Sequence, residues 1–343
     1  MKAVFLSKLG GPGVLKTTSI PDPKPVQNDE VLVHLKAAGV NYAETLARRG
    51  LYGWTPRKKD FILGLEGAGT VEEIGPQVSD LTPGDNVIVV NNSGCYAEYI
   101  KLPRKQIYPA FSHYSFEENA AFAVSFFTAY IALQEMARVR YGETLLVQAA
   151  AGGLGTATVL LGKVMGLKTA GTASQDQKLT FLVDKLGIDL AINYKTENFV
   201  KGVKEWTKGE GIDIILESVG GKVFHDSLAC LAPMGRLVIV GASGIRFNKL
   251  NPLTWYPAWR ALPRVNVLEM LGRSQGVLAF HAGRLLDSSY DRLEASFNNL
   301  VKIVRKNSIK PIIDEVYPLE RAGDAHRRLE SRQNIGKIVL KIN

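Results

Sequence analysis

The stretch that most constrains this 343-residue chain runs over 144–155, where an apolar run leads into a glycine-rich turn. Residues 145–147 predict a buried strand, and the apolar spacing over 154–165 predicts a helix directly after the turn. A βαβ unit holds a pyrophosphate at such a turn, because glycines let phosphate oxygens approach the backbone N–H groups at the helix N-terminus. The stretch therefore predicts a dinucleotide-binding turn.

The turn matches the dinucleotide-binding fingerprint incompletely. Gly152 and Gly155 supply its last two glycines, and Ala150 stands in the first position. Because a glycine-rich turn can also serve only as a close-packing device, the prediction depends on residues further along the chain. The cofactor-binding residues expected here are Ala150, Gly152, Gly153, Leu154 and Gly155.

From residue 115 onward, helical and strand patterns alternate. Strands are expected at 145–148, 168–172, 190–192, 212–216 and 236–240, each separated by a helix-length segment. This alternation predicts an α/β fold with a parallel, doubly wound sheet. The segment 265–270 is interpreted as a further strand at the sheet edge, where unpaired backbone groups would favour pairing with a second subunit, so we expect a homodimer.

The first third of the chain has a different pattern. Short β-type runs at 3–6, 31–37, 69–74, 86–90 and 96–100 are separated by turn residues, which predicts a compact β barrel. One helix is expected at 42–49, between Asn41 as N-cap and Gly50. Near the end, 293–306 predicts an amphipathic helix and 337–342 predicts a final strand.

Composition excludes several classes of protein. The two cysteines, Cys95 and Cys230, lie far from each other and from any Cys/His cluster, so a disulfide framework and a structural zinc lobe are excluded. The formal charge of +9 is spread along the chain, which favours a basic surface that attracts a polyanionic cofactor over a nucleic-acid site. We find no signal peptide and no apolar stretch long enough for a transmembrane segment, so a cytoplasmic protein is expected.

The residues after the second strand of the βαβ unit decide which cofactor is favoured. NAD calls for a carboxylate at the tip of that strand, but 170–174 contains no acid. Thr172, Ser174 and Lys178 instead offer hydroxyls and a cation for a 2′-phosphate, and Tyr194 could stack or donate a hydrogen bond. We therefore expect NADPH. The alternative is that Ser174 only caps the next helix and that Lys178 is solvated.

Motifs along nearly the whole chain resemble the medium-chain dehydrogenase/reductase superfamily, in its quinone oxidoreductase (zeta-crystallin) branch. The motifs of the cofactor part are 149–155, 171–173, 192–194 and 218–221, and those of the barrel part are 38–42, 50–52 and 63–69. The C-terminal motifs at 255–259, 280–283, 309–311 and 334–337 resemble the vesicle amine transport protein homologues of the same branch.

This resemblance implies a GroES-like catalytic domain over 1–124, completed by the returning C-terminal segment 286–343, and a Rossmann NADP-binding domain over 125–285. The active site would lie in the cleft between them. Asn41 and Tyr52 would be the catalytic oxyanion donors, with a helix cap and an exposed loop aromatic as the alternative interpretations. The remaining cofactor contacts that the resemblance implies are Thr128, Ser218, Val219, Gly241, Ala242, Ser243 and Asn334.

The zinc members of this superfamily carry a cysteine near position 38, a Gly-His-Glu motif and a four-cysteine lobe. This chain has Asn41, has Leu65 in place of the histidine, and lacks the cysteines, so no zinc ligand set remains. We expect zinc-free hydride transfer to a quinone or an α,β-unsaturated carbonyl. Two departures from the branch are Glu44, where Asp is usual in Asn-x-x-Asp, and Leu46, where several bacterial members carry an aromatic residue.

Two other functions compete with this one. The first is a non-catalytic cofactor-binding protein that acts at membranes or on RNA, and the second is an enoyl-thioester reductase. The aromatic, proline-rich stretch 250–263 is interpreted as a lid or a dimer-flanking loop, because its prolines oppose a long amphipathic membrane helix. A peripheral membrane contact stays open, and no obligatory nucleic-acid partner is expected.

Overall fold

The computed structural model describes residues 1–52, 61–245, 252–288 and 290–343. The chain divides into two compact units, one formed by Met1–Ser125 with Lys310–Asn343 and the other by Phe126–Ile309. The first boundary lies next to the one expected after residue 124. The second lies at Lys310 instead of 286, and each unit is described below by itself.

The first unit is built on a seven-stranded sheet in which the end of the chain takes part. Its order is β15-β16-β3-β5-β6-β8, with β7 paired to β3. The strand β16 (Lys337–Lys341) runs antiparallel to β3 (Glu30–Val40), so the end of the chain lies inside this sheet. The other strands are β5 (Glu66–Ile74), β6 (Asn86–Val90), β7 (Tyr99–Pro103), β8 (Ile107–Pro109) and β15 (Ile313–Pro318).

A smaller sheet and three helices complete this unit. The small sheet has the order β2-β1-β4, with β1 at Lys2–Leu6, β2 at Lys16–Ser19 and β4 at Phe61–Ile62. The helices are α1 (Tyr42–Arg48), α11 (Ala322–Glu330) and the beginning of α2 (Phe116–Tyr130). Alternate residues of β3, among them Val31, Val33 and Leu35, are fully buried in one apolar core.

The second unit contains a six-stranded parallel sheet, as the alternating pattern predicted. Its order is β11-β10-β9-β12-β13-β14, so the direction of winding reverses between β9 and β12. In such sheets, ligands bind beyond the carboxyl ends of the strands at this switch point. The strands are β9 (Thr144–Val147), β10 (Lys168–Ala173), β11 (Leu190–Asn193), β12 (Ile212–Glu217), β13 (Leu231–Ile239) and β14 (Gly276–Ala279).

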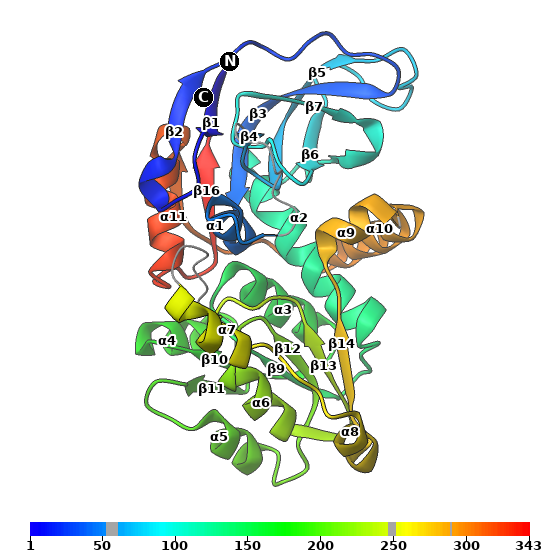
Figure 1. Ribbon diagram of the computed structural model, residues 1–343. Helices are drawn as coiled ribbons and strands as arrows, with labels where there is room; N and C mark the ends of the chain where they lie inside the picture. Colours follow the sequence, from blue (N-terminus) through cyan, green and yellow to red (C-terminus); the bar gives the residue numbers. More distant parts are fainter. Residues whose placement is uncertain (53–60, 246–251, 289) are drawn as a thin grey trace. The chain divides into compact units, whose positions relative to one another are not determined.

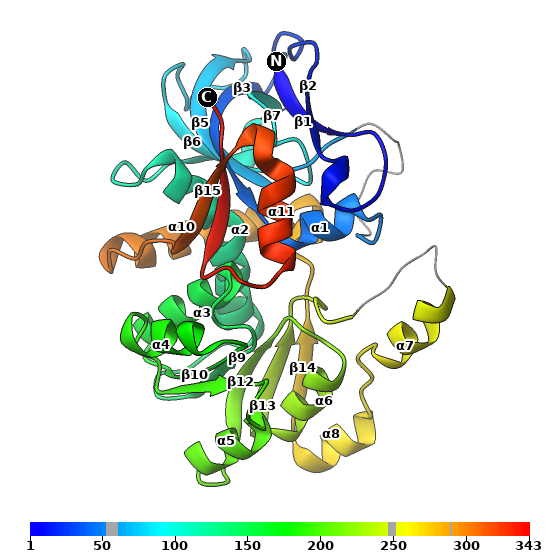
Figure 2. The same ribbon diagram turned by 90° about the vertical axis from the view of Figure 1, so that its left-hand side faces the viewer.

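Helices cover both faces of the parallel sheet (Figures 1 and 2). One face carries α3 (Gly153–Val164) and α4 (Asp176–Asp184), and the other carries α5 (Phe199–Trp206) and α6 (Lys222–Ala229). The sheet core includes Leu146, Ile215 and Leu237, which are fully buried. A sheet buried on both faces explains why these strands are apolar runs without alternation.

The prediction of a strand over 265–270 is wrong. Residues Val267–Arg273 form the helix α8, because the side chain of Asn266 accepts hydrogen bonds from the backbone N–H groups of Leu268 and Glu269. An ion pair of 2.9 Å between Glu269 and Arg273, one turn apart, supports the helix. The edge of the sheet is β14 instead. The strand expected at 96–100 is also displaced and forms β7 at Tyr99–Pro103.

The helix α10 (Tyr290–Lys306) belongs to the second unit, although its segment was expected with the first. The ring of Phe297 lies 5.5 Å from that of Phe127 on α2, edge to face, and the Ser296 hydroxyl donates to Glu135. Glu135 lies in Ile131–Met136, a wide helical turn that extends α2. The remaining helices are α7 (Trp255–Arg260) and α9 (Ala282–Ser288). Within the described ranges, none of the helices has the length and apolar character needed to cross a bilayer.

Candidate active site

The glycine-rich turn lies between β9 and α3, at the switch point of the sheet. Gly152 is the N-cap of α3, and the first-turn N–H groups of Gly153, Leu154 and Gly155 therefore have no intrahelical acceptor. These donors and the positive end of the helix dipole suit a diphosphate. A Cβ at Gly155 would lie 2.5 Å from the carbonyl oxygens of Ala149 and Ala150, so only glycine fits there.

Ala150 replaces the first glycine of the fingerprint because β10 makes room for it. A Cβ added to Gly171 would lie 2.6 Å from the Cβ of Ala150, which is completely buried. The glycine that makes this close approach possible therefore lies on the neighbouring strand and not in the turn. The sequence shows both residues, but their contact follows only from the pairing of β9 with β10.

Thr172 was expected to face the adenosine end of the cofactor, but its side chain is buried beneath the glycine-rich turn. Its hydroxyl donates to the side chain of Gln148 at 2.7 Å and accepts from the N–H of Ala149 at 3.2 Å. Since Thr172 is 1% exposed, this hydroxyl shapes the turn from inside instead of facing a ligand.

The other three adenosine-end residues lie beyond the carboxyl ends of β10 and β11. Ser174 is half-buried and is not the cap residue of α4, because Gln175 holds that position. Lys178, on the first turns of α4, is 6% exposed, so the interpretation as a solvated lysine is wrong. Tyr194 follows β11, is 38% exposed, and donates its backbone N–H to Ala173.

Hydrogen bonds join the loop after β12 to the loop after β13. Five further residues that were predicted to contact the cofactor lie in these two loops. The carbonyl of Ser218 accepts from both the backbone N–H and the hydroxyl of Ser243, each at 2.9 Å. The carbonyl of Val219 accepts from the N–H of Gly244. Gly241 and Ala242 lie in the same pair of loops, at the carboxyl ends of the two strands. Thr128 is half-buried on α2.

Sequence reasoning missed the anchor of these loops, Glu217. This carboxylate is fully buried at the end of β12 and accepts hydrogen bonds from the N–H groups of Val219 and Gly220 at 2.7 and 2.9 Å. Burial raises the pKa of Glu217, against the lowering effect of those hydrogen bonds. A charged residue that ends an apolar strand just before Ser-Val-Gly-Gly was the available signal.

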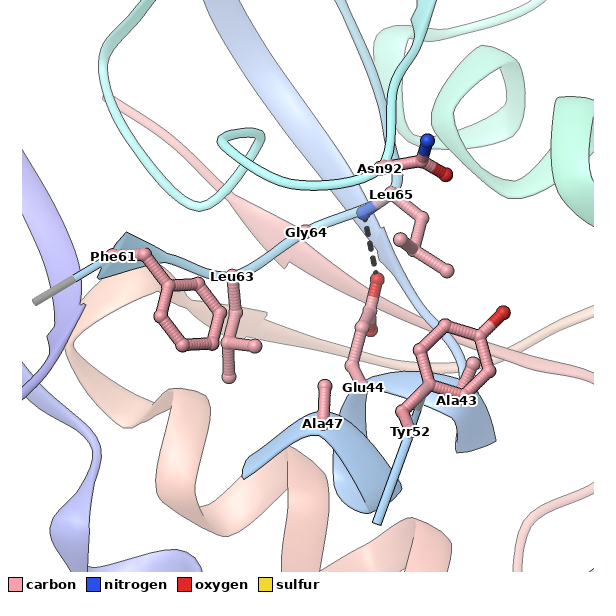
Figure 3. Close-up of a pocket in the computed structure, with 9 residues that line it drawn as sticks. All are labelled: Ala43, Glu44, Ala47, Tyr52, Phe61, Leu63, Gly64, Leu65 and Asn92. Carbon is pink, nitrogen blue, oxygen red and sulfur yellow. Dashed lines mark hydrogen bonds between the residues drawn. The ribbon is translucent and has the colours of Figure 1, made fainter. Parts of the chain in front are cut away.

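In the first unit, Tyr52 lines a small pocket together with residues of α1 and of the segment that leads into β5 (Figure 3). Tyr52 is half-buried, so it is not the exposed loop aromatic of the alternative interpretation. Burial, and then the charge of Glu44, raise the pKa of Tyr52 from its ordinary 10 to about 12, so the hydroxyl keeps its proton well above neutral pH. The pocket is lined by Ala43, Glu44, Ala47, Tyr52, Phe61, Leu63, Gly64, Leu65 and Asn92.

Glu44 lies at the centre of this pocket and is 1% exposed (Figure 3). Its Oε2 accepts from the N–H of Asn41 at 2.7 Å and from the Tyr96 hydroxyl at 2.5 Å, and its Oε1 accepts from the N–H of Leu65 at 2.8 Å. Burial nevertheless raises the pKa of Glu44 to about 7. The sequence signal was its place three residues after the cap Asn41, where a carboxylate closes a capping box.

Asn41 is the N-cap of α1, as one interpretation held, and its amide belongs to a buried ionic cluster. Its Nδ2 donates to Glu66 at 3.0 Å and more weakly to Glu44, and its Oδ1 accepts from the Lys337 ammonium. Lys337 and Glu66 form an ion pair of 2.5 Å, and both are at least 96% buried. With both N–H groups of its amide engaged, Asn41 holds α1 against β16, and its role as an oxyanion donor stays a prediction.

Asn334 also serves its own unit. It is 5% exposed and its amide donates to the carbonyl of Gly336 at 2.8 Å, just before β16. Its predicted contact with the cofactor phosphates stays a prediction. Among the residues that the structure describes, no three His, Cys, Asp or Glu side chains come together as a metal site.

The first unit is a mostly antiparallel sheet completed by the chain end, and the second is a parallel sheet with a glycine turn at its switch point. This combination is the architecture of medium-chain dehydrogenases and reductases. Family models agree, since the one described as alcohol dehydrogenase GroES-like domain matches residues 27–112 and the one described as zinc-binding dehydrogenase matches residues 186–340.

Comparison with individual proteins shows which members of this superfamily the chain is similar to. A synaptic vesicle membrane protein VAT-1 homolog of Danio rerio is 33% identical over 99% of this chain and 69% of its own length. A quinone oxidoreductase of Rattus norvegicus is 31% identical over 99% of this chain and 97% of its own. The Escherichia coli quinone oxidoreductase complexed with NADPH superposes with a TM-score of 0.87, at 29% identity, covering 99% and 100% of the two chains. The chain belongs to the medium-chain dehydrogenase/reductase superfamily, with the VAT-1 homologues and quinone oxidoreductases, and its family is one of oxidoreductases.

Proposed function

We propose that this protein is an NADPH-dependent oxidoreductase that reduces quinones or α,β-unsaturated carbonyl compounds without zinc. The observation that carries the proposal is the turn over 149–155, with its unpaired N–H donors at the switch point of the parallel sheet. The solved Escherichia coli relative, a quinone oxidoreductase in complex with NADPH, supports both the cofactor and the acceptor class.

The chain offers a distinct group for each part of the reaction. The first-turn N–H groups of α3 would hold the diphosphate, and Lys178 with Ser174 would hold the 2′-phosphate. The bound cofactor supplies hydride. The hydroxyl of Tyr52 would donate a hydrogen bond to the oxyanion that forms on the acceptor.

Zinc independence is supported by the residues at the positions where the zinc members of the superfamily have ligands. Asn41 and Leu65 offer neither imidazole nor thiolate. The remaining carboxylate, Glu66, is already neutralised by the ammonium of Lys337. An acceptor that is electrophilic by itself, such as a quinone or an enone, needs only hydrogen-bond donors for its oxyanion.

The proposal is tested by mixing the purified protein with NADPH and a panel of quinones, enones and enoyl thioesters while recording nicotinamide absorbance. We expect turnover of a quinone or an enone, unchanged after dialysis against a metal chelator. Preference for a thioester would favour the enoyl-thioester alternative. Tight binding of NADPH without turnover of any acceptor would contradict the proposal.

The adenosine end is tested by Lys178→Ala. Removing a charge-assisted hydrogen bond of about 1.5–3 kcal/mol should weaken NADPH binding about 10- to 100-fold and leave NADH binding nearly unchanged. Isothermal titration with both cofactors measures the two affinities. Lys185→Ala is the matched control, because Lys185 is exposed just after the same helix. If the ratio of the NADPH and NADH affinities is unchanged in Lys178→Ala, then Lys178 does not bind the 2′-phosphate.

A second function, attachment to an anionic membrane surface, is favoured by one apolar region. Over 252–273, large apolar side chains of α7, of α8 and of the segments beside them are exposed. The chain has no acidic residue between Arg236 and Glu269. Aromatic and aliphatic side chains beside arginines suit the interface of an anionic bilayer. The exposed residues are Leu253, Trp255, Tyr256, Trp259, Leu262, Val265, Val267, Leu268 and Leu271. Several relatives are themselves named synaptic vesicle membrane proteins.

Co-sedimentation tests this second function. We expect binding to phosphatidylserine vesicles, weak binding to phosphatidylcholine vesicles, and loss of binding in Trp255→Ser/Trp259→Ser. The control Tyr141→Ser removes an exposed aromatic side chain elsewhere, in the turn before β9. Sedimentation velocity without vesicles tests whether a second copy of the chain covers this surface instead. If the unchanged protein is a dimer that does not bind vesicles, and the double variant is a monomer, the region belongs to the interface of the predicted homodimer.

A further inference from the structure

The first acidic residue after β10 is Asp176, and its carboxylate is held by a single amide. Asp176 is exposed on the first turn of α4 and lies between Ser174 and Lys178 along the chain. Its Oδ1 accepts a hydrogen bond of 2.9 Å from Nδ2 of Asn193. Among the described residues, Asn193 is the sole hydrogen-bond partner of this carboxylate. The orientation of the Asp176 charge therefore depends on Asn193.

Asn193 reaches Asp176 because of the way β10 and β11 pair. The two strands are parallel, with Ala173 opposite Asn193, and α4, which begins just after β10, packs against both (Figure 1). Asn193 is 6% exposed, and its Oδ1 accepts from the backbone N–H of Lys195 at 3.2 Å, as in an Asx-turn. The oxygen of the amide is thus bound to its own loop, and its N–H group is directed at α4.

A carboxylate at this place bears on the choice between the two nicotinamide cofactors. In dinucleotide-binding folds, an acid just beyond the second strand accepts a hydrogen bond from the 2′-hydroxyl of NADH. The same negative charge repels the 2′-phosphate of NADPH. Ser174 and Lys178, the residues proposed for that phosphate, flank Asp176 in the chain. NADPH binding therefore requires that the Asp176 charge be kept away from the adenosine ribose.

We propose that Asn193 is a positioning residue for cofactor specificity. By holding the Asp176 carboxylate at the end of β11, Asn193 keeps that charge from the 2′-phosphate and favours NADPH over NADH. The inference rests on the proposed function, because it concerns the adenosine end of the same cofactor. A hydrogen bond to an ionised acceptor is stronger than one between neutral groups, so the amide competes well for this carboxylate.

A second acid near the end of β11 is also bonded to Asn193. The backbone N–H of Asn193 donates to Oε1 of Glu197 at 3.1 Å, and the carbonyl of Asn193 accepts from the N–H of Glu197 at 2.8 Å. One acid is therefore held by the side chain of Asn193 and the other by its backbone. Of the two acids, only Asp176 is released when the Asn193 side chain is shortened.

The substitution Asn193→Ser separates the bond to Asp176 from the turn. The shorter hydroxyl can still accept from the N–H of Lys195 in an ST-turn, but it does not reach α4. The ratio of NADPH to NADH affinity should fall about 3- to 10-fold, because the released carboxylate repels the 2′-phosphate and accepts from the 2′-hydroxyl. Isothermal titration measures both affinities.

A double-mutant cycle and a matched control complete the test. In the Asp176→Asn background, Asn193→Ser should leave the ratio of the two affinities within about a factor of two, since no charge is released. Asn198→Ala is the control, because it removes another amide of the same loop, one that caps α5. If Asn193→Ser weakens both cofactors alike, or lowers the ratio equally with and without Asp176→Asn, Asn193 only orders its loop and the inference is wrong.

Two nucleotides without a nicotinamide separate this inference from the proposed reaction. Adenosine 2′,5′-bisphosphate carries the 2′-phosphate, and adenosine 5′-monophosphate lacks it. Their affinity ratio should fall in Asn193→Ser in the same direction as that of the cofactors. An unchanged nucleotide ratio would overturn the role of Asn193 and leave the proposed reaction standing. A lowered ratio in a protein that turns over no acceptor would overturn the reaction and support Asn193. Failure of the unchanged protein to bind NADPH would overturn both.

Discussion

At the scale of single residues, the dinucleotide turn depends on one missing Cβ. At Gly155 the nearest atoms to such a Cβ are two backbone carbonyl oxygens and one carbonyl carbon, all at 2.5–2.6 Å. Real Cβ atoms essentially never approach so closely, and backbone atoms cannot swing aside as a side chain can. Any side chain here must push the first turn of α3 away from β9.

Gly155→Ala should therefore weaken NADPH binding by at least about tenfold and lower the free energy of unfolding by about 1–3 kcal/mol. Fluorescence titration and urea unfolding measure the two effects. Gly13→Ala is the matched control, because a Cβ at Gly13 meets no atom within 4 Å. Equal effects of both substitutions would contradict the steric argument.

A second prediction at this scale concerns stability at acid pH. Unfolded histidine takes up a proton below pH about 6.5, whereas His326 stays neutral down to pH about 3. Since the unfolded state then binds more protons, stability is lost as the pH falls through this window. Glu44 acts in the opposite sense: its folded pKa of about 7 exceeds the ordinary 4.5, so its contribution is present below pH about 4.5 and is lost as the pH rises toward 7.

His326→Gln removes the first effect and should resist acid better. Relative to the unchanged protein, its free energy of urea unfolding should rise as the pH is lowered from about 7 to about 4. His113→Gln, which changes an exposed histidine, is the control and should follow the unchanged protein. A constant difference between His326→Gln and the unchanged protein across that range would show that His326 does not titrate abnormally.

At the scale of elements, the pairing of β9 with β10 explains how an alanine enters the fingerprint. Ala150 N–H donates to the carbonyl of Thr172, which fixes the turn against β10. The Cβ of Ala150 then fills the space that Gly171 leaves. The same pairing places Thr172 under the turn, so two positions that were expected to contact a ligand hold the strand–turn–helix unit together instead.

A double-mutant cycle tests this exchange. Gly171→Ala alone should cost about 1–3 kcal/mol of stability, because two Cβ atoms would meet at 2.6 Å. Ala150→Gly should restore most of that loss in the combined variant, and it would give the fingerprint all three of its glycines, at positions 150, 152 and 155. Urea unfolding of the four proteins measures the coupling. Additive losses in the double variant would contradict the proposed exchange of space.

At the scale of the whole molecule, the formal charge of +9 attracts a polyanionic cofactor from a distance. The association rate constant of NADPH should therefore fall several-fold as ionic strength rises from about 0.01 M to about 0.15 M, where the Debye length shortens from about 30 Å to about 8 Å. Stopped-flow fluorescence measures it. The control is kcat/KM for an uncharged quinone at saturating NADPH, which should stay constant. A salt-independent NADPH rate would show that the net charge plays no part.

The architecture could be predicted from the sequence alone. The apolar runs of the parallel strands and the alternating pattern of β3 reflect which faces of each strand are buried. The caps at Asn41 and Ser115 depend on hydrogen bonds within a few residues of the chain. The misplaced strand at 265–270 shows the limit of such reasoning. Short apolar runs suit a strand or a helix equally, and the local cap of Asn266 favoured the helix.

Contacts between elements that are distant in the chain determine which polar side chains hold the fold together. The Thr172 hydroxyl donates to Gln148, and Asn41 contacts the ion pair of Lys337 and Glu66. Glu44 accepts a hydrogen bond from the Tyr96 hydroxyl, which in turn contacts Nε2 of His326. These partners are up to 296 residues apart in the chain. Periodicity reports which face of an element is buried, whereas a hydrogen bond between distant elements depends on how the strands pair. Such contacts join Glu44, a departure from a motif in the sequence, to Tyr96 and to the pocket that Tyr52 lines.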